Sequence, residues 1–345
     1  MHSKRLVSLT CAALLAGCVF GLTSAAASAA SLSGAGSTLV APIMAEWIAA
    51  FDNTTGDTVT YNSVGSGTGY KDIANGLVDF GASDAPLSAY STPACANCVQ
   101  IPWALTATDA SYHINGLRLA RGQHSLHLTG PVIAQIYLGQ ITNWDSSAIT
   151  KLNPGAHIPS TPISVFWRSD PSGDSFAFTR YLSDISGAFA GKVGPSTAPS
   201  FPVGAGAKGN GGMATALETT NGGIAYIATA YLISNHLPAA GVKNAAGRYV
   251  VPNLSAIEAA AAVVHHVPAN NQVTIVDPPR SAKSAFPIST FTYVMVPTNA
   301  PQGALLRQFI GYCLGGGQAF GPALDFAPLP KGVKAADERT LAGIS

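Results

Sequence analysis

Residues 168–175 read Arg-Ser-Asp-Pro-Ser-Gly-Asp-Ser and join a predicted strand, 163–167, to a predicted helix, 176–182. Small hydroxyl residues and a glycine at the start of a helix aim N–H groups and hydroxyls at one point. The helix dipole favours negative charge at that point. The arginine that ends the strand can add a bidentate guanidinium. This stretch therefore predicts an α/β fold that carries a cradle for an oxyanion.

The same strand–turn–helix design occurs twice more, in Gly34-Ala35-Gly36-Ser37-Thr38 and in Gly65-Ser66-Gly67-Thr68-Gly69. A further predicted strand ends at the acidic turn that contains Asp84. This β-turn-α rhythm is typical of α/β proteins, whose ligands lie at the carboxyl ends of strands. We expect all three turns and Asp84 to occupy such positions, with Ser37 and Thr68 forming turns rather than contacting a ligand.

Strands are also predicted at residues 101–105, 111–114 and 274–276, and helices at 211–219, 254–264 and 302–314.

Composition limits both the size and the class of the protein. The 345 residues are enough for one large or two medium domains, with 47% hydrophobic and only 10% charged residues. The formal net charge is +1, and it becomes −1 without residues 1–30, which carry Lys4 and Arg5. A nearly neutral chain of this kind disfavours nucleic acid as a partner.

The first 30 residues have the pattern of a signal peptide. Basic residues open the chain, residues 6–23 are apolar, and 25–30 are small. The mature protein is therefore expected in the periplasm or otherwise outside the cytoplasm. The stretch 15–18, Leu-Ala-Gly-Cys, also matches a lipoprotein cleavage box, in which Cys18 would carry a lipid. The Ala-Ser-Ala site downstream favours ordinary cleavage, and both alternatives stay open.

Cys95 and Cys98 are spaced C-x-x-C in a loop. In an oxidising compartment this spacing favours a local disulfide over free thiols, and over redox or metal chemistry, which the loop context does not support. Cys313 lies in an apolar helical pattern and is expected to be a buried thiol. The pair His265-His266 has no carboxylate or cysteine at metal-ligand spacing. We therefore predict neither a metal nor a cofactor.

A set of ordered segments covers nearly all of the mature chain and resembles the periplasmic phosphate-binding protein of ABC-type phosphate importers. The most specific segment is 79–87, Asp-Phe-Gly-Ala-Ser-Asp-Ala-Pro-Leu. The other matching segments are 34–38, 65–67, 136–139, 144–145, 152–155, 168–176, 209–210, 223–226, 286–288 and 329–330.

The resemblance implies a two-lobed periplasmic-binding-protein fold of type II, with two hinge strands and the ligand in the cleft between the lobes. Lobe one would comprise residues 31–106 and 283–345, and lobe two residues 107–282. It also implies a monomer that captures inorganic phosphate and delivers it to the permease and ATPase subunits of an importer. Such a protein is not an enzyme.

Carried over by position, the resemblance assigns the phosphate contacts to residues of both lobes, with Asp170 orienting Arg168. The chain departs from the family at Leu39, where an aromatic residue is common and only the amide is needed. It also departs at Asp174, where threonine is common, and at Pro171, where glycine is more common. The implied contacts are Thr38, the amide of Leu39, Ser66, Asp84, Arg168, Ser172, Gly173 and Asp174.

Two aspartates in an anion site would select for protonated oxyanions. Ionised carboxylates only accept hydrogen bonds, and phosphate near neutral pH still carries protons, whereas sulfate carries none. An unpaired buried acceptor costs about 1–3 kcal/mol, so Asp84 and Asp174 would exclude sulfate. The doubly protonated phosphate ion would fit best, and we expect affinity to weaken above neutral pH. Alternatively, Asp84 caps its turn and Asp174 is a helix N-terminal charge.

Other functions fit the sequence less well. Residues 173–177, Gly-Asp-Ser-Phe-Ala, lack the second glycine of a hydrolase nucleophile elbow, so a secreted hydrolase is disfavoured. Residues 65–72 fail the P-loop pattern. A protein of the same fold that binds another oxyanion, or that senses or scavenges phosphate at the cell surface, remains an alternative.

Overall fold

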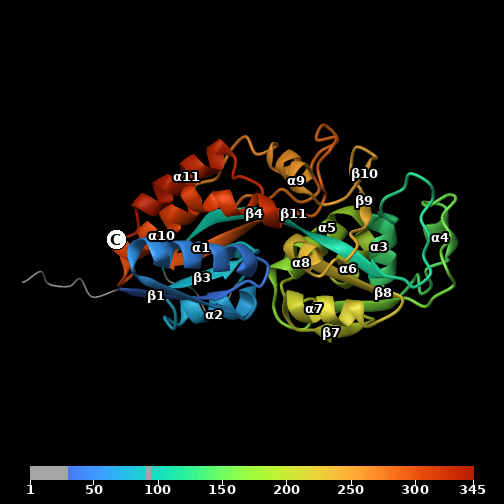
Figure 1. Ribbon diagram of the computed structural model, residues 1–345, viewed down its shortest axis with the longest axis horizontal. Helices are drawn as coiled ribbons and strands as arrows, with labels where there is room; N and C mark the ends of the chain where they lie inside the picture. The colour runs from blue at the N-terminus through green and yellow to red at the C-terminus, as the bar shows by residue number, and fades with distance from the viewer. Residues whose placement is uncertain (1–29, 91–94, 96) are drawn as a thin grey trace, which may run out of the picture.

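The computed structural model describes residues 30–90, 95 and 97–345. The predicted signal segment, apart from Ala30, and Cys18 lie outside these residues. The described chain forms an elongated molecule with two lobes side by side (Figure 1). Within it, no helix combines the length and apolarity needed to cross a membrane.

The strands of the described residues are β1 (Ser31–Gly36), β2 (Thr58–Ser63), β3 (Phe80–Ser83), β4 (Cys98–His113), β5 (His127–Thr129), β6 (Ser164–Arg168), β7 (Ala205–Ala207), β8 (Gly223–Ala228), β9 (Gly241–Lys243), β10 (Tyr249–Val250) and β11 (Ser289–Pro297). The helices are α1 (Ala41–Thr55), α2 (Ser66–Ala74), α3 (Gly130–Tyr137), α4 (Ser147–Thr150), α5 (Gly173–Ile185), α6 (Gly187–Lys192), α7 (Gly209–Glu218), α8 (Thr229–Ser234), α9 (Leu254–Ala261), α10 (Gly303–Leu314) and α11 (Lys331–Ala342).

One mixed sheet runs through both lobes. In the described residues its strand order is β2-β1-β3-β11-β4-β8-β6-β7, and a smaller sheet has the order β10-β9-β5. We use lobe one for the part built on β1, β2 and β3, and lobe two for the part built on β6, β7 and β8. Strand β4 pairs with β11 along its first part and with β8 along its last part, antiparallel in both cases. This arrangement confirms the predicted two-lobed α/β fold.

Strand β4 corrects one sequence prediction. The sequence indicated two strands, 101–105 and 111–114, whereas the chain forms one strand from Cys98 to His113. The polar residues between them stay extended because β11 and β8 continue the hydrogen-bonded pairing across the gap. The predicted lobe boundary at residue 106 falls inside this strand, and the boundaries therefore stay a proposal.

The strand predicted at 274–276 is wrong. That segment belongs to no strand. Just before it, the hydroxyl of Tyr293 bonds to both the amide and the carbonyl of Val273, which occupies the two groups that a neighbouring strand would pair with at that residue.

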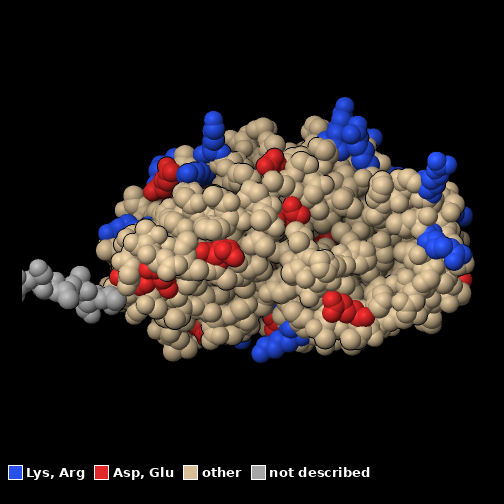
Figure 2. Space-filling model, viewed as in Figure 1, with Lys and Arg blue, Asp and Glu red and all other residues tan. Residues whose placement is uncertain are grey.

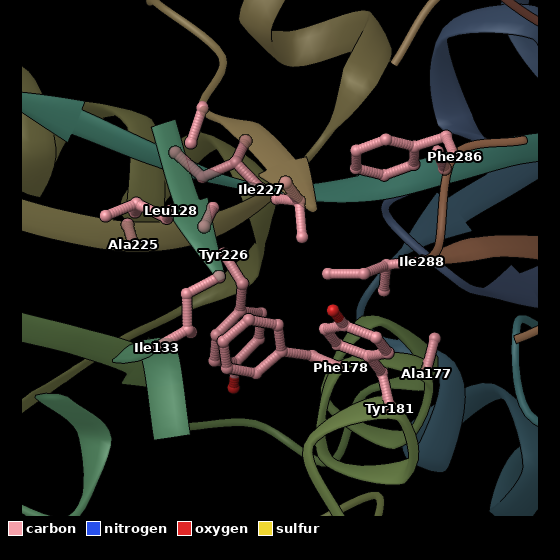
Figure 3. Close-up of a cluster of buried hydrophobic side chains, with 14 of the residues drawn as sticks. Leu128, Ile133, Ala177, Phe178, Tyr181, Ala225, Tyr226, Ile227, Phe286 and Ile288 are labelled. Atoms are coloured by element: carbon pink, nitrogen blue, oxygen red, sulfur yellow. The ribbon is translucent and has the colours of Figure 1, made fainter. Parts of the chain in front are cut away.

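Each lobe has its own buried core. In lobe one, Trp47 of α1 packs on Trp103 of β4, with ring centroids 5.3 Å apart, and Phe309 of α10 lies against the same ring. In lobe two, side chains from β8, α3 and α5 fill the core and meet Phe286 and Ile288 from the chain that leads into β11 (Figure 3). The two cores are joined through β4 and β11, which contribute buried side chains to both of them.

The cysteines follow the sequence prediction. Cys95 and Cys98 are joined in a disulfide, and Cys313 is a buried free thiol. Charged side chains are sparse on the face seen in Figure 2, where lysines and arginines lie mainly toward the edges. This distribution agrees with a chain that is only 10% charged.

Candidate anion-binding site

The structure brings the sequence-predicted contact residues together where the two lobes meet. Lobe one supplies residues that follow β1 and β3 and that open α2, and lobe two supplies residues that end β6 and open α5. All of them are buried, and the most exposed, Thr38, has only 7% of its surface accessible. The residues in this cluster are Thr38, Leu39, Ser66, Asp84, Arg168, Ser172, Gly173 and Asp174.

Asp84 is the centre of the lobe-one half. Ser37 Oγ lies 2.7 Å from each Asp84 carboxylate oxygen, and Ser66 Oγ donates to Oδ2 at 3.2 Å. Ser66 is the first residue of α2, and the left-handed φ of 96° at Gly65 sets its direction. Sequence reasoning gave Ser37 only a turn-forming role. Its position within one of the glycine turns was the available signal for this contact.

The environment of Asp84 favours its protonated form. Burial, followed by the nearby charge of Asp174, raises the pKa of the Asp84 carboxyl from 3.8 to about 7. The hydroxyl groups of Ser37 and Ser66 and the charge of Arg168 oppose this rise without cancelling it. Asp84 is therefore a buried carboxyl that exchanges its proton near neutral pH.

Arg168 organises the lobe-two half. It holds Asp170 through two bonds, Nε to Oδ1 at 2.8 Å and Nη2 to Oδ2 at 2.5 Å, and donates to Asp174 Oδ2 through Nη1 at 2.7 Å. Burial of the Asp170 carboxyl opposes its ionisation, but the hydrogen bonds and charge of Arg168 outweigh burial and lower its pKa. Burial likewise opposes the charge on Arg168, but Asp170 and Asp174 raise the pKa of the guanidinium. The arginine therefore stays charged and fixed in place.

Asp174 is surrounded by donors from its own lobe and from β4. Thr108 Oγ1 donates to Oδ1 at 2.6 Å, and Asn210 Nδ2 donates to Oδ2 at 2.9 Å, in addition to Arg168. Sequence reasoning missed both new donors. Asn210 lies in one of the family-like segments without an assigned role, and Thr108 lies in the gap between two predicted strands, so it carried no signal.

The core of lobe two supports the site directly. The ring of Tyr226 stacks on Phe178, with centroids 4.6 Å apart (Figure 3). Its hydroxyl lies 2.7 Å from Ser175 Oγ and accepts the amide of Arg168 at 2.9 Å. Burial raises the pKa of Tyr226 to about 12, so the phenol stays neutral. A close-packed aromatic cluster thereby positions the backbone that carries Arg168.

Hydrogen bonds cross between the lobes at the same place. The amide of Gly173 donates to Ser66 Oγ, and the amide of Gly67 donates to the carbonyl of Pro171, both at 3.0 Å. These two contacts hold the cleft closed around the buried groups. Within lobe one, the amide of Leu39, a predicted anion contact, donates to Ser37 Oγ at 3.0 Å.

Two groups that hydrolysis commonly uses, a histidine paired with a serine and a bound metal, can be checked in the structure. Ser175, the residue at the elbow-like position, has the hydroxyl of Tyr226 as its partner instead of a histidine. Among the described residues, no group of three or more histidine, cysteine, aspartate or glutamate side chains could hold a metal ion. One arginine, several hydroxyls and a carboxyl with a pKa raised to about 7 thus meet in one buried cluster.

Comparison with known proteins agrees with this description. Residues 23–315 match the model of the PBP superfamily domain. The chain is 34% identical to the phosphate-binding protein PstS of Xylella fastidiosa (strain Temecula1), over 87% of this chain and 81% of that protein. It is 32% identical to PstS of Pasteurella multocida (strain Pm70), over 94% of each chain.

The solved structures share the fold. A high-affinity periplasmic phosphate-binding protein, PfluDING, solved with bound phosphate, superposes with a TM-score of 0.71 at 24% identity, covering 88% of this chain and 92% of the other. These matches confirm the family predicted from the ordered sequence segments. The chain belongs to the PBP superfamily and, within it, to the family of phosphate-binding proteins named PstS.

Proposed function

We propose that this protein captures inorganic phosphate outside the cytoplasm and delivers it to an ABC importer. The observation that carries the proposal is Asp84, a fully buried carboxyl with a pKa raised to about 7, in a cluster with hydroxyl, amide and guanidinium donors. The PstS relatives, which are named phosphate-binding proteins, support it.

The charges of the cluster favour phosphate over sulfate. Arg168 is already matched by Asp170 and Asp174, so a fully ionised cluster would carry excess negative charge around an entering anion. When Asp84 is ionised, above its pKa of about 7, an anion that brings its own proton can donate that proton to the carboxylate. Sulfate carries no proton to donate. An unpaired buried acceptor costs about 1–3 kcal/mol, which is roughly 10- to 100-fold in affinity.

The contacts that we propose for phosphate are those that the sequence predicted. Donors come from Thr38, Ser66, Ser172, Arg168 and the amides of Leu39 and Gly173, and acceptors from Asp84 and Asp174. Asp174 already receives three close hydrogen bonds, so Asp84 is the main proton acceptor. An entering anion would exchange with the bonds that Leu39 and Gly173 make to serine hydroxyls.

We further propose that the protein acts as a monomer without enzymatic activity and that closure of its lobes is recognised by the permease of an importer whose ATPase drives uptake. The interlobe hydrogen bonds from Gly173 to Ser66 and from Gly67 to Pro171 support the closure of the lobes. The signal-peptide pattern of the first 30 residues supports an extracytoplasmic location, with cleavage after residue 30 or lipid attachment at Cys18 as the two alternatives.

Calorimetry on phosphate-stripped mature protein tests the proposal, with phosphate, arsenate and sulfate as titrants. We expect phosphate to bind with micromolar or tighter affinity, arsenate to compete because it carries the same protons, and sulfate to show no heat. Equal binding of sulfate would mean that Asp84 does not face the anion. Binding of sulfate or another oxyanion without phosphate would overturn the proposed ligand.

A further inference from the structure

Asn210 is a fully buried residue at the start of α7, and it faces lobe one. Its amide orientation is fixed, because Oδ1 accepts the backbone N–H of Ala228 at 2.9 Å and a backbone N–H can only donate. Nδ2 must then point the other way. It lies 2.9 Å from Thr38 Oγ1 and 2.9 Å from Asp174 Oδ2. The backbone amide of Asn210 donates to the same Thr38 oxygen at 3.2 Å.

These bonds decide how the Thr38 hydroxyl can act. A threonine hydroxyl has one proton to donate and two lone pairs that accept. Asn210 supplies two donors to that oxygen, one from its backbone and one from its side chain, and so fills both lone pairs. The proton of Thr38 is then its one free hydrogen-bonding group. An oxygen of a bound oxyanion is the acceptor that such a proton fits.

The same bonds join the two lobes. Thr38 follows β1 in lobe one, whereas Asn210 opens α7 in lobe two. We propose that Asn210 is a positioning residue that latches the closed lobes and holds the Thr38 hydroxyl as a donor toward bound phosphate, without contacting the phosphate itself. This inference rests on the proposed function of the cleft.

The latch predicts a kinetic signature. Its bonds form only once the lobes have met, so their loss acts on ligand release and hardly on encounter. Replacement of the Asn210 side chain removes one interlobe hydrogen bond, from Nδ2 to Thr38 Oγ1, because the backbone N–H of residue 210 stays in place. The loss of one such bond corresponds to roughly 2- to 10-fold faster release. If Asn210 merely held α7 against β8 through Ala228, its replacement would lower stability without a specific effect on release.

Release of radiolabelled phosphate, chased with unlabelled phosphate, tests the latch in wild type, Asn210→Ala, Thr38→Val and the double variant. We expect Asn210→Ala to release phosphate roughly 2- to 10-fold faster, with the association rate unchanged. In the Thr38→Val background the second substitution should add less than about 1.5-fold, because the interlobe bond is already gone. Fully additive effects, or an unchanged release rate for Asn210→Ala, would overturn the inference.

Two further variants separate the latch from a role in folding. Asn210→Asp places an acceptor where Nδ2 donates, beside Asp174, so it should bind phosphate more weakly than Asn210→Ala; affinity equal to wild type would contradict the latch. Asn244→Ala removes a buried lobe-two asparagine that bonds to the carbonyls of Lys283 and Ala285. It should lower the Tm and leave release unchanged, and accelerated release in this control would assign the effect to general destabilisation.

A failure of the proposed function would be seen separately, as the absence of phosphate binding by wild type. In that case the rate of hydrogen exchange of the Asn210 backbone amide measures its bond to Thr38 in the absence of ligand. Thr38→Val should then speed exchange of that amide, since it removes the acceptor oxygen. Unchanged exchange would overturn the latch itself.

Discussion

Gly173 is the point at which lobe two comes closest to Asp84, and replacing it with alanine tests whether binding requires this closure. A methyl group at Gly173 would lie 2.5 Å from Asp84 Cβ and 2.6 Å from its Cα and backbone N. Ordinary contacts of that kind begin at 3.4 Å, so the lobes must separate by about 1 Å at this point. Because Asp84 meets the methyl group with its backbone, a side-chain rotation cannot relieve the clash.

That separation would move the Gly173 amide, which exchanges its bond to Ser66 for one to the anion, out of hydrogen-bonding range of the bound anion. It would also stretch the bond from Gly67 to Pro171, 3.0 Å long, beyond that range. At about 0.5–1.5 kcal/mol for each bond, together with the strain on the remaining interlobe contacts, the loss comes to about 2–4 kcal/mol. Phosphate affinity should therefore fall roughly 30- to 1000-fold.

Calorimetry with phosphate measures this loss, and small-angle scattering shows whether the liganded variant stays more open than wild type. Gly211→Ala is the matched control, because a methyl group at this α7 position meets nothing within 4 Å; its affinity should stay within about twofold of wild type. A Gly173→Ala protein that is folded and binds phosphate within about threefold of wild type would refute the argument that closure at Asp84 supplies affinity.

Three other predictions concern the charged groups. Affinity for total phosphate should fall between pH 6 and pH 8.5, because free Asp84 and free phosphate lose protons that the complex must recover; equal affinity at both values would contradict this. Protonated Asp84 favours the folded state. Its contribution to the free energy of unfolding is fully present below pH 3.8 and is lost as the pH rises through about 7. Asp84→Asn should therefore raise the Tm of phosphate-free protein more at pH 8.5 than at pH 4.5, and an equal gain at both would show that Asp84 does not titrate there. Arg168→Lys gives up most of three short bonds to Asp170 and Asp174 and should weaken phosphate binding roughly 100-fold in a filter-binding assay, whereas Arg180→Lys, at an exposed ion pair, should have no effect.

Local sequence was enough to predict most of the elements that carry the site. Residues 168–175 predicted a strand, a turn and a helix start, and the structure has β6 ending at Arg168 and α5 beginning at Gly173. Such signals are local, since an N-cap serine or a turn glycine acts through the backbone beside it. Helix α11 was not predicted, because its sequence is polar and only a few of its residues are buried.

Local sequence patterns could not predict the pairing of strands that are far apart in the chain. The continuity of β4 depends on β11 and β8, which lie more than a hundred residues away in the chain. The same holds for Thr108, whose role at Asp174 appears only once β4 is continuous.

The sequence by itself determined the fold class, the family and most of the residues that meet in the cleft, because each of these depends on short motifs in a fixed order along the chain. The tertiary structure alone decided how those residues share their protons. Burial and the approach of Asp174 set the pKa of Asp84 near 7, and Asn210 turned Thr38 into a donor. These properties depend on dehydration and on distances across two lobes, which no single stretch of sequence contains.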